Sequence, residues 1–439
     1  MNERMTFDGF SRPFGTCRSS NLDSAVNCRA ILKSPSGRGK PSALKVQTPR
    51  LLRGQGRRDA YPTLLPRGLS LGPSRVVLFL LIVLATVCIH AAEATRKFLY
   101  VAAPGVRNYL EYGGHGVLVF DIERDYRFVK RIASAGLDEK GAPLNVKGVC
   151  ASAATGRLYL STLRTLLCFD LVTEKILWEK PYEGGCDRMG IAPDGKFIYL
   201  PSLEKAHWHV IDALSGDILK KLVPDSGAHN TIVSLDGRHA YLAGLKSPLL
   251  RVTDTKAHEI IREVGPFSSA IRPFTVNGRG TLCFVNVNGL LGFEVGDLTT
   301  GKKLHRVEVA GFKAGVPKRH GCPSHGVGMT PDEKEIWVTD ATNKRLHVFD
   351  ATDATVMPPK QLTDVVLRDE PGWVTFSLDG RHAWPSTGEI IDTKSRKIIA
   401  TLKDEKGADV QSEKIVEIHF QGDKPVRTGD QFGLGRVLK

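Results

Sequence analysis

The chain has 439 residues, of which 41% are hydrophobic and 25% charged, a composition typical of a folded globular protein. Its formal net charge of +14 would suit a partner such as nucleic acid or an anionic membrane surface. Residues 1–96, however, contain 15 Lys and Arg and only 5 Asp and Glu. They carry +10 of the net charge and leave +4 for the rest, so the body of the protein is not expected to bind nucleic acid.

Residues 1–74 form the first segment of the chain. They are rich in Arg, Ser, Pro and Gly, and their hydrophobic residues show no helical or strand periodicity. Such a segment does not bury enough apolar surface to fold. It is predicted to be a disordered basic extension, or the product of a start codon assigned too early.

Residues 75–94 are predicted to be a signal peptide. The apolar run "VVLFLLIVLATVCIHAA" at 76–92 follows Arg75 and ends at Ala92-Glu93-Ala94, an A-x-A type cleavage site. An uncleaved membrane anchor is the alternative, because the run approaches the roughly 18 to 20 residues that span a bilayer. Lipid attachment at Cys88 is less favoured, because bulky Val87 precedes it. We expect a periplasmic or secreted protein with no membrane span after cleavage.

Short repeats begin soon after the signal. The segment "SLDGRHA" occurs at 234–240 and at 377–383, and "APDGKFIYL", "TPDEKEIWV" and "AATGRLYL" are its relatives. Each predicts a strand, an Asp-Gly type turn and a second strand. A third strand then ends in an acidic residue, namely Asp121, Asp170, Asp212, Asp254, Glu294, Asp350 and Asp392. Units of about 42 residues without helical periodicity are typical of four-stranded, WD40-like propeller blades.

The number of each kind of strand predicts how the ring closes. Seven third strands indicate seven blades, but only six first strands precede a turn, and the chain opens on a second-type strand at 96–103. The missing first strand is found at 414–424, near the C-terminus. We therefore predict an all-β, seven-bladed β-propeller over 95–425, in which the C-terminal strand completes the first blade, followed by a tail at 426–439.

These repeats resemble those of YVTN-type bacterial exported propellers, which are related to lactonase-like and amine-dehydrogenase-like propellers. The resemblance covers roughly residues 97–425 and implies the architecture, while members of such families perform different functions on one scaffold. Two blades depart from the pattern. Blade five has "VNGRGTLCFVN", and blade six has Glu333 in place of the turn glycine. These two blades are expected to be the least regular.

The repeat also predicts a ring of residues at one mouth of the central channel. Eight positions before the turn residue, at the start of each innermost strand, blades two to seven have Gly148, Asp187, His229, Arg272, His325 and Gly372. Neighbouring positions add Lys147, Arg188, Asn230 and Trp373, and the closing strand adds Glu417. Buried ions need water, a partner or a ligand. The ring is therefore a hydrated polar channel, an anion site in which Arg and His outweigh Asp187, or a metal site.

Two long loops are expected to flank the same mouth. They are "PGVRNYLEYGGHG" at 104–116, with His115, and "AGFKAGVPKRHGCPS" at 310–324. Loops on a rigid scaffold often carry function. Just before the sixth inner strand, His320, Cys322 and His325 crowd into six residues, and imidazole with thiolate suits zinc or copper. His207 and His209 share one face of a strand, which is expected to be an exposed polar face.

Five cysteines, Cys150, Cys168, Cys186, Cys283 and Cys322, follow the signal. They form no C-x-x-C pair, so disulfides are not expected to hold the fold together. Walker, H-E-x-x-H, G-x-G-x-x-G and C-x-x-C-H motifs do not occur in the sequence, and G-x-S-x-G does not occur after the predicted signal peptide.

Three functions follow from these observations. We expect a monomer that binds a small anionic or polar ligand, or a partner protein, at the mouth. The second possibility is a lactonase-like hydrolase with His229 or His325 as the base, Asp187 or Glu417 as its orienting partner and Arg272 as the anion clamp. The third is a metal or redox role for the cluster of His320, Cys322 and His325.

Overall fold

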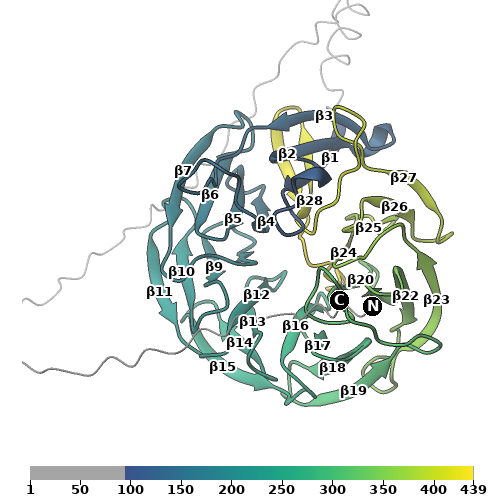
Figure 1. Ribbon diagram of the computed structural model, residues 1–439. Coiled ribbons are helices and arrows are strands. Elements are labelled where there is room, and N and C mark those ends of the chain that lie inside the picture. Colours follow the sequence, from purple (N-terminus) through teal and green to yellow (C-terminus); the bar gives the residue numbers. More distant parts are fainter. Residues whose placement is uncertain (1–93, 439) are drawn as a thin grey trace, which may run out of the picture. The chain divides into compact units, whose positions relative to one another are not determined.

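The computed structural model describes residues 94–438, and these form an all-β, seven-bladed propeller (Figure 1). Seven antiparallel sheets follow one another around a ring. The proposed extension at 1–74 lies outside the described residues, as does the proposed signal peptide except for Ala94. In the described part of the chain, no helix has the length and hydrophobicity needed to cross a membrane. The helical turns there are η2 (Leu110–Tyr112) and η3 (Ile122–Arg124).

Each blade is one sheet, and its strands follow one another from the channel outward. Blade 1 consists of β29 (Lys424–Thr428), β28 (Ile415–Gln421), β1 (Thr95–Ala103), β2 (Gly116–Asp121) and β3 (Arg127–Ile132). Blade 2 consists of β4 (Val146–Ser152), β5 (Arg157–Thr162), β6 (Thr165–Asp170) and β7 (Ile176–Pro181). Blade 3 consists of β8 (Gly190–Ile191), β9 (Phe197–Pro201), β10 (Trp208–Asp212) and β11 (Ile218–Leu222). Blades 4 and 5 consist of β12 (Ala228–Val233), β13 (His239–Gly244), β14 (Leu250–Asp254) and β15 (Glu259–Val264); and β16 (Ile271–Val276), β17 (Leu282–Val287), β18 (Gly292–Asp297) and β19 (Lys303–Glu308). Blades 6 and 7 consist of β20 (Val327–Met329), β21 (Glu335–Asp340), β22 (Arg345–Asp350) and β23 (Lys360–Val366); and β24 (Val374–Phe376), β25 (His382–Pro385), β26 (Glu389–Asp392) and β27 (Ile398–Thr401).

The predicted closure of the ring is confirmed. Strand β28, from the C-terminal end of the chain, pairs antiparallel with β1, with Tyr100 opposite Val416. This pairing removes the edges that a cut ring would expose. Strand β29 was not predicted. It adds a fifth strand to blade 1 on the channel side of β28, with Ile418 opposite Thr428, so the predicted C-terminal tail begins inside a strand.

The repeated turns follow from local chemistry. In "SLDGRHA" the Asp236 side chain accepts hydrogen bonds from the Ser234 hydroxyl (2.6 Å) and from the Arg238 amide (3.0 Å). Gly237 then adopts φ 72°, a left-handed conformation that glycine adopts readily. Glu333 takes the same role in blade 6 with φ 63°, which costs a non-glycine residue roughly 1–2 kcal/mol. Its carboxylate accepts the amide of Val437 (2.9 Å) and so holds the C-terminal tail.

The acidic residue that ends each third strand caps the following turn, but in blade 5 this residue is not the predicted one. Asp212 is typical, because its Oδ1 accepts the amides of Leu214 and Ser215. In blade 5 the residue with this role is Asp297, which accepts the amide of Thr299 at 2.7 Å. The assignment of Glu294 was therefore wrong, and this side chain is instead fully buried. Blade 5 thus departs from the repeat pattern, and the shortest innermost strand is β8 in blade 3.

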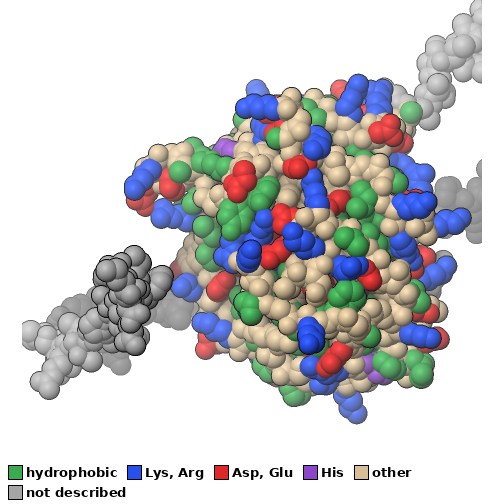
Figure 2. Space-filling model, turned by 45° about the vertical axis from the view of Figure 1, so that its right-hand side comes forward, with side chains coloured by type: hydrophobic (Ala, Val, Ile, Leu, Met, Phe, Trp, Pro, Cys, Tyr) green, Lys and Arg blue, Asp and Glu red, His purple; other side chains and the backbone are tan. Residues whose placement is uncertain are grey.

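The C-terminal tail occupies the interior of the ring. The Gln431 side chain accepts the amide of Val149 on β4 at 2.9 Å, and the Gly433 carbonyl accepts the amide of Met329 at 2.8 Å. Phe432 and Leu434 are buried. The channel is therefore filled along part of its length by the chain itself. On the outer surface, Figure 2 shows basic and acidic side chains interspersed rather than segregated.

Candidate functional site

A polar cavity of about 380 Å³ lies at the end of the ring where the innermost strands begin. Its wall comes from several blades and from both long loops. The residues that line it are Arg107, Asn108, Asn145, Lys147, Leu163, Arg188, Glu204, His229, Leu245, Arg272, Arg319, His320, Gly321, His325, Glu413 and Lys414. The structure therefore brings the predicted His229, Arg272 and His325 together around one space.

Asp187 and His229 form a buried pair in the wall of this cavity. Asp187 Oδ2 lies 2.6 Å from His229 Nδ1, and Lys147 Nζ lies 3.7 Å from Asp187 Oδ1. Burial raises the pKa of Asp187, but the contact with His229 and the charge of Lys147 outweigh burial and leave the pKa below its usual range. Burial also lowers the pKa of His229 despite the nearby carboxylate. A neutral His229 therefore donates from Nδ1 to an ionised Asp187.

Arg188 connects this pair to the second half of the site. Its Nη1 lies 3.2 Å from His229 Nε2, and its Nη2 lies 2.5 Å from Glu413 Oε2. The guanidinium carbon also lies 4.7 Å from the ring centroid of Trp373, a favourable cation–π geometry. Because arginine only donates, the lone pair of His229 Nε2 is occupied by Arg188.

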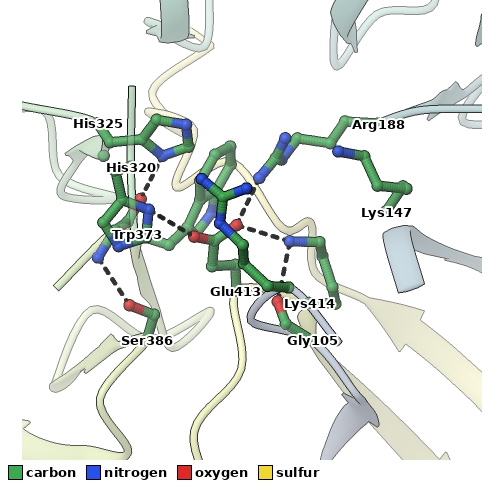
Figure 3. A network of polar contacts seen from close by, with 12 residues as sticks. Gly105, Lys147, Arg188, His320, His325, Trp373, Ser386, Glu413 and Lys414 are labelled. Atoms are coloured by element: carbon green, nitrogen blue, oxygen red, sulfur yellow. Dashed lines mark hydrogen bonds and ion pairs between the residues drawn. The ribbon is translucent and has the colours of Figure 1, made fainter. Parts of the chain in front are cut away.

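Glu413 is the centre of the second half of the site (Figure 3). Lys414 Nζ donates to Glu413 Oε2 at 2.7 Å, and His320 Nδ1 lies 3.3 Å from Oε1. Burial raises the pKa of Glu413, but the charges of Lys414 and Arg188 hold it well below its usual value. Burial, reinforced by Arg188, lowers the pKa of Lys414 to about 7. A single carboxylate therefore forms ion pairs with two buried basic side chains.

His320 and His325 stack against each other beside Glu413, with ring centroids 4.9 Å apart. His325 Nδ1 lies 2.9 Å from the carbonyl oxygen of Gly372. A side chain at Gly372 would overlap His320, so this packing requires glycine. Burial lowers the pKa of both histidines. His320, His325 and Glu413 each offer one potential metal-ligand atom, and these three atoms lie within 4.8 Å of one another. However, Arg188 and Lys414 already bind the carboxylate of Glu413 and would repel a metal ion.

Both long loops reach the same mouth, as predicted, and they contact each other beside the cavity. Arg107 Nε donates to the carbonyl oxygen of Arg319 at 2.9 Å. Arg319 Nη2 in turn donates to the Tyr112 hydroxyl at 2.7 Å, and its guanidinium lies over the rings of Tyr109 and Tyr112. His115 points elsewhere and contacts the carbonyl oxygen of Ala135 at 3.3 Å. The loop thus contributes Arg107, rather than His115, to the cavity.

Arg272 stands apart from the ion pairs of the site. Its Nε donates to Asn288 Oδ1 at 2.5 Å and its Nη2 lies 3.3 Å from the carbonyl oxygen of Gly321. Within residues 94–438, no carboxylate forms a salt bridge with Arg272. This guanidinium is therefore positioned, but its charge is not neutralised.

Other predicted site residues lie away from the cavity. Glu417 accepts the Leu378 amide at 2.6 Å and contacts His419 at 2.5 Å; it does not orient His229 or His325. Cys322 donates to the carbonyl oxygen of Ser324 at 3.0 Å, and burial raises the pKa of its thiol to about 12. Asn230 is buried and pairs through its backbone with Arg188. Cys322 is not part of the group of potential metal ligands that His320, His325 and Glu413 form.

Sequence reasoning missed Glu413, Lys414 and Arg319. The repeat contained a signal for the lysine, because Lys414 lies eight positions before Gly422, the turn glycine of the closing strand. Lys414 is therefore the seventh member of the ring, and Glu413 is its neighbour. Arg319 lies in a loop without a repeat equivalent, so no periodic signal indicated it.

A second cavity, of about 610 Å³, lies between the inner strands of blades 2 to 4 and the C-terminal tail. Its wall includes Ile191, Val233, Phe432 and Leu434, together with a few charged side chains of the tail. It is larger than the mouth cavity, but none of the predicted site residues lines it. The ionisable cluster therefore distinguishes the mouth as the candidate site.

Solved structures with the same architecture are distant in sequence. No protein-family model matches the chain, and neither does any curated protein. The structure is similar to that of the dihydro-heme d1 dehydrogenase NirN in complex with DHE, with a TM-score of 0.52 and 12% identity over 76% of this chain and 73% of that chain. A chain of the mitotic checkpoint complex has a TM-score of 0.50 and 14% identity over 61% of this chain and 80% of that one. At these identities the likeness shows the propeller fold alone.

Proposed function

We propose that the mouth cavity binds a small organic anion, such as a carboxylate or a phosphate ester. The observation that carries this proposal is the charge of the wall. Six basic side chains line the cavity, Arg107, Lys147, Arg188, Arg272, Arg319 and Lys414, against two acidic ones, Glu204 and Glu413. Such an excess attracts anions and strengthens charge-assisted hydrogen bonds.

Arg272 is the residue we assign to direct contact with the anion. Its guanidinium is oriented by Asn288 and lies beside Gly321, while Arg188, Lys414 and Arg319 already have carboxylate partners. An arginine with a fixed orientation presents paired donors that match a carboxylate or phosphate. Lys147 lines the same cavity, but it is already paired with Asp187 at 3.7 Å, which leaves Arg272 as the better candidate.

The proposal includes the setting of the protein. We infer that the chain belongs to the YVTN-type exported propellers and acts in the periplasm or outside the cell as a monomer. The repeats and the apolar run at 76–92 support this inference. Cell fractionation of the full chain would test it, and retention in the cytoplasm would contradict it.

Calorimetric titration at low ionic strength tests the anion site. Citrate and glycerol 3-phosphate are the probes, with glycerol as the uncharged control. Arg272→Gln should weaken anion binding by roughly 10- to 150-fold, because hydrogen bonds to charged groups contribute about 1.5–3 kcal/mol. Arg238→Gln is the matched control, since Arg238 is exposed and pairs with Asp236 in a repeat turn. Equal binding by wild type and Arg272→Gln would contradict the assignment.

Hydrolysis is the second candidate function, and the Asp187–His229 pair favours it. A histidine oriented by a buried carboxylate is a suitable general base. However, Arg188 donates to the nitrogen that would accept the proton, so this chemistry requires Arg188 to move toward a bound anion. A screen of carboxylated lactones and phosphate esters tests the idea. Activity that persists in His229→Ala would exclude His229 as the base.

A further inference from the structure

A second cluster of potential metal ligands lies on the connections of blades 2 and 3. Glu183 follows β7, His207 directly precedes β10, and His209 is the second residue of β10. One ligand atom from each residue lies within 4.8 Å of the other two. None of the three lines the mouth cavity, so the cluster is independent of the proposed anion site.

The two histidines are buried, contrary to the prediction of an exposed polar face. His207 is 5% exposed and His209 is 1% exposed. Their ring centroids are 4.6 Å apart. His209 Nδ1 is buried and, within the described residues, has no hydrogen-bond partner. A buried polar atom without a partner is destabilising, and a bound ligand would satisfy this nitrogen.

The orientation of His207 leaves one ring nitrogen available. Its Nε2 lies 3.0 Å from the backbone carbonyl oxygen of Glu183. A carbonyl oxygen only accepts, so Nε2 carries the proton and the lone pair is on Nδ1. Gly184 permits this approach, because a Cβ at this position would lie 3.2 Å from His207 Cε1 and the residue has φ +80°. The Leu203 amide donates to the Gly184 carbonyl at 3.0 Å and fixes the two loops together.

Glu183 completes the cluster with an oxygen donor. Lys221 Nζ binds its Oε2 at 2.7 Å, while no hydrogen bond to Oε1 is formed by any described residue. Lys221 is partly exposed, so its ammonium can move into solvent. The exposed oxygen of Glu183 thus faces the two buried imidazoles of His207 and His209, all within 4.8 Å of one another.

We propose that Glu183, His207 and His209 form a binding site for a divalent transition metal, with Zn²⁺ as the representative ion. Two imidazoles and one carboxylate are a donor set that binds zinc and leaves a coordination position for water or another ligand. Nitrogen donors favour transition metals over Mg²⁺ and Ca²⁺. Ligand atoms around tetrahedral zinc are about 3.4 Å apart. The exposed Glu183 side chain can supply the small inward movement that this requires.

Titration of the untagged full chain with Zn²⁺ and with Co²⁺ tests the site. Calorimetry measures the stoichiometry and affinity for Zn²⁺, and the visible absorption of Co²⁺ reports its coordination. The variants are Glu183→Gln, which changes an exposed side chain and should not affect folding, and His207→Gln. His320→Gln is the matched control, because His320 belongs to the other histidine cluster. Circular dichroism confirms that each variant is folded.

The proposal predicts one saturable Zn²⁺ site. Both Glu183→Gln and His207→Gln should weaken binding at least tenfold and reduce the Co²⁺ absorption, whereas His320→Gln should leave both unchanged. Three results would overturn the proposal: no saturable binding by the wild type, wild-type affinity in both variants, or loss of the site in His320→Gln. The last result would assign the metal to the channel mouth instead.

Discussion

Replacing Glu413 by Gln removes the carboxylate at the centre of the channel mouth while keeping the size of the side chain. In the wild type this carboxylate contacts Arg188 at 2.5 Å, Lys414 at 2.7 Å and His320 at 3.3 Å. All four side chains are buried, with Glu413 6% exposed and Lys414 2% exposed. The glutamine oxygen can still accept a hydrogen bond, but it neutralises neither cation.

The expected cost follows from the burial of these groups. Removing one partner of a buried ion pair typically destabilises a protein by about 3–5 kcal/mol, because a buried charge is left without compensation. Lys414 can reduce this cost by losing its proton, since its pKa is already lowered by burial and by Arg188. We therefore expect Glu413→Gln to lower the free energy of unfolding by about 3 kcal/mol near neutral pH.

The same substitution should strengthen anion binding. It removes one of the two acidic side chains in the cavity wall, so citrate should bind Glu413→Gln more tightly than the wild type. Binding to the folded state then restores part of the lost stability. Stability and function thus respond in opposite directions to one substitution.

Urea unfolding at low salt, with and without citrate, measures both effects. The matched control is Glu405→Gln, because Glu405 forms an exposed ion pair with Arg131, and such pairs contribute about 0–1 kcal/mol. If Glu413→Gln were as stable as Glu405→Gln, the carboxylate would not be neutralising the buried cations. Citrate binding that is weaker than in the wild type would contradict the electrostatic argument.

Three further predictions concern other parts of the molecule. Burial, with Arg188, lowers the pKa of Lys414 from 10.5 to about 7. The unfolded chain therefore holds this proton more strongly, and the free energy of unfolding should rise as pH rises from 7 toward 10. Lys414→Met should flatten this rise in urea unfolding, and an unchanged slope would contradict the prediction. Burial raises the pKa of Cys322 to about 12, and all five cysteines of residues 94–438 are buried. A thiol reagent should therefore label these cysteines only after denaturation. Peptide mapping that finds the label on Cys322 of the native protein would argue against this packing. Deleting residues 429–439 removes buried Phe432 and Leu434 and should lower the free energy of unfolding by about 3–6 kcal/mol, whereas unchanged urea unfolding would show that the tail is not part of the folded ring.

Many residues of the channel mouth could be predicted from the sequence. The repeat determines how far along the innermost strand a residue lies and to which side of the blade its side chain projects. Asp187, His229 and His325 were found at one offset from the turn, and the structure places them at one end of the ring. The same offset applied to Gly422 indicates Lys414, which was overlooked. Glu417 lies three residues further along β28, about 10 Å deeper at the usual rise of a strand, where it caps the turn of blade 7 instead.

The remaining features depend on tertiary contacts without a repeat equivalent. The connection that precedes β28 brings Glu413 to Arg188, which is 225 positions away in the sequence. Strand β29 and Gln431 occupy the channel through contacts with blades 1, 2 and 7. The burial of His207 and His209 results from the packing of blade 2 against blade 3, which periodicity within one strand does not report.

The most direct test of the anion site is the location of a bound anion. Crystals of the protein soaked in selenate would be examined by anomalous diffraction at the selenium edge, because selenate has the charge and shape of small tetrahedral anions. We predict an anomalous peak in the mouth cavity within hydrogen-bond distance of Arg272. Selenate bound elsewhere, with none beside Arg272, would contradict the assignment of this arginine to the anion.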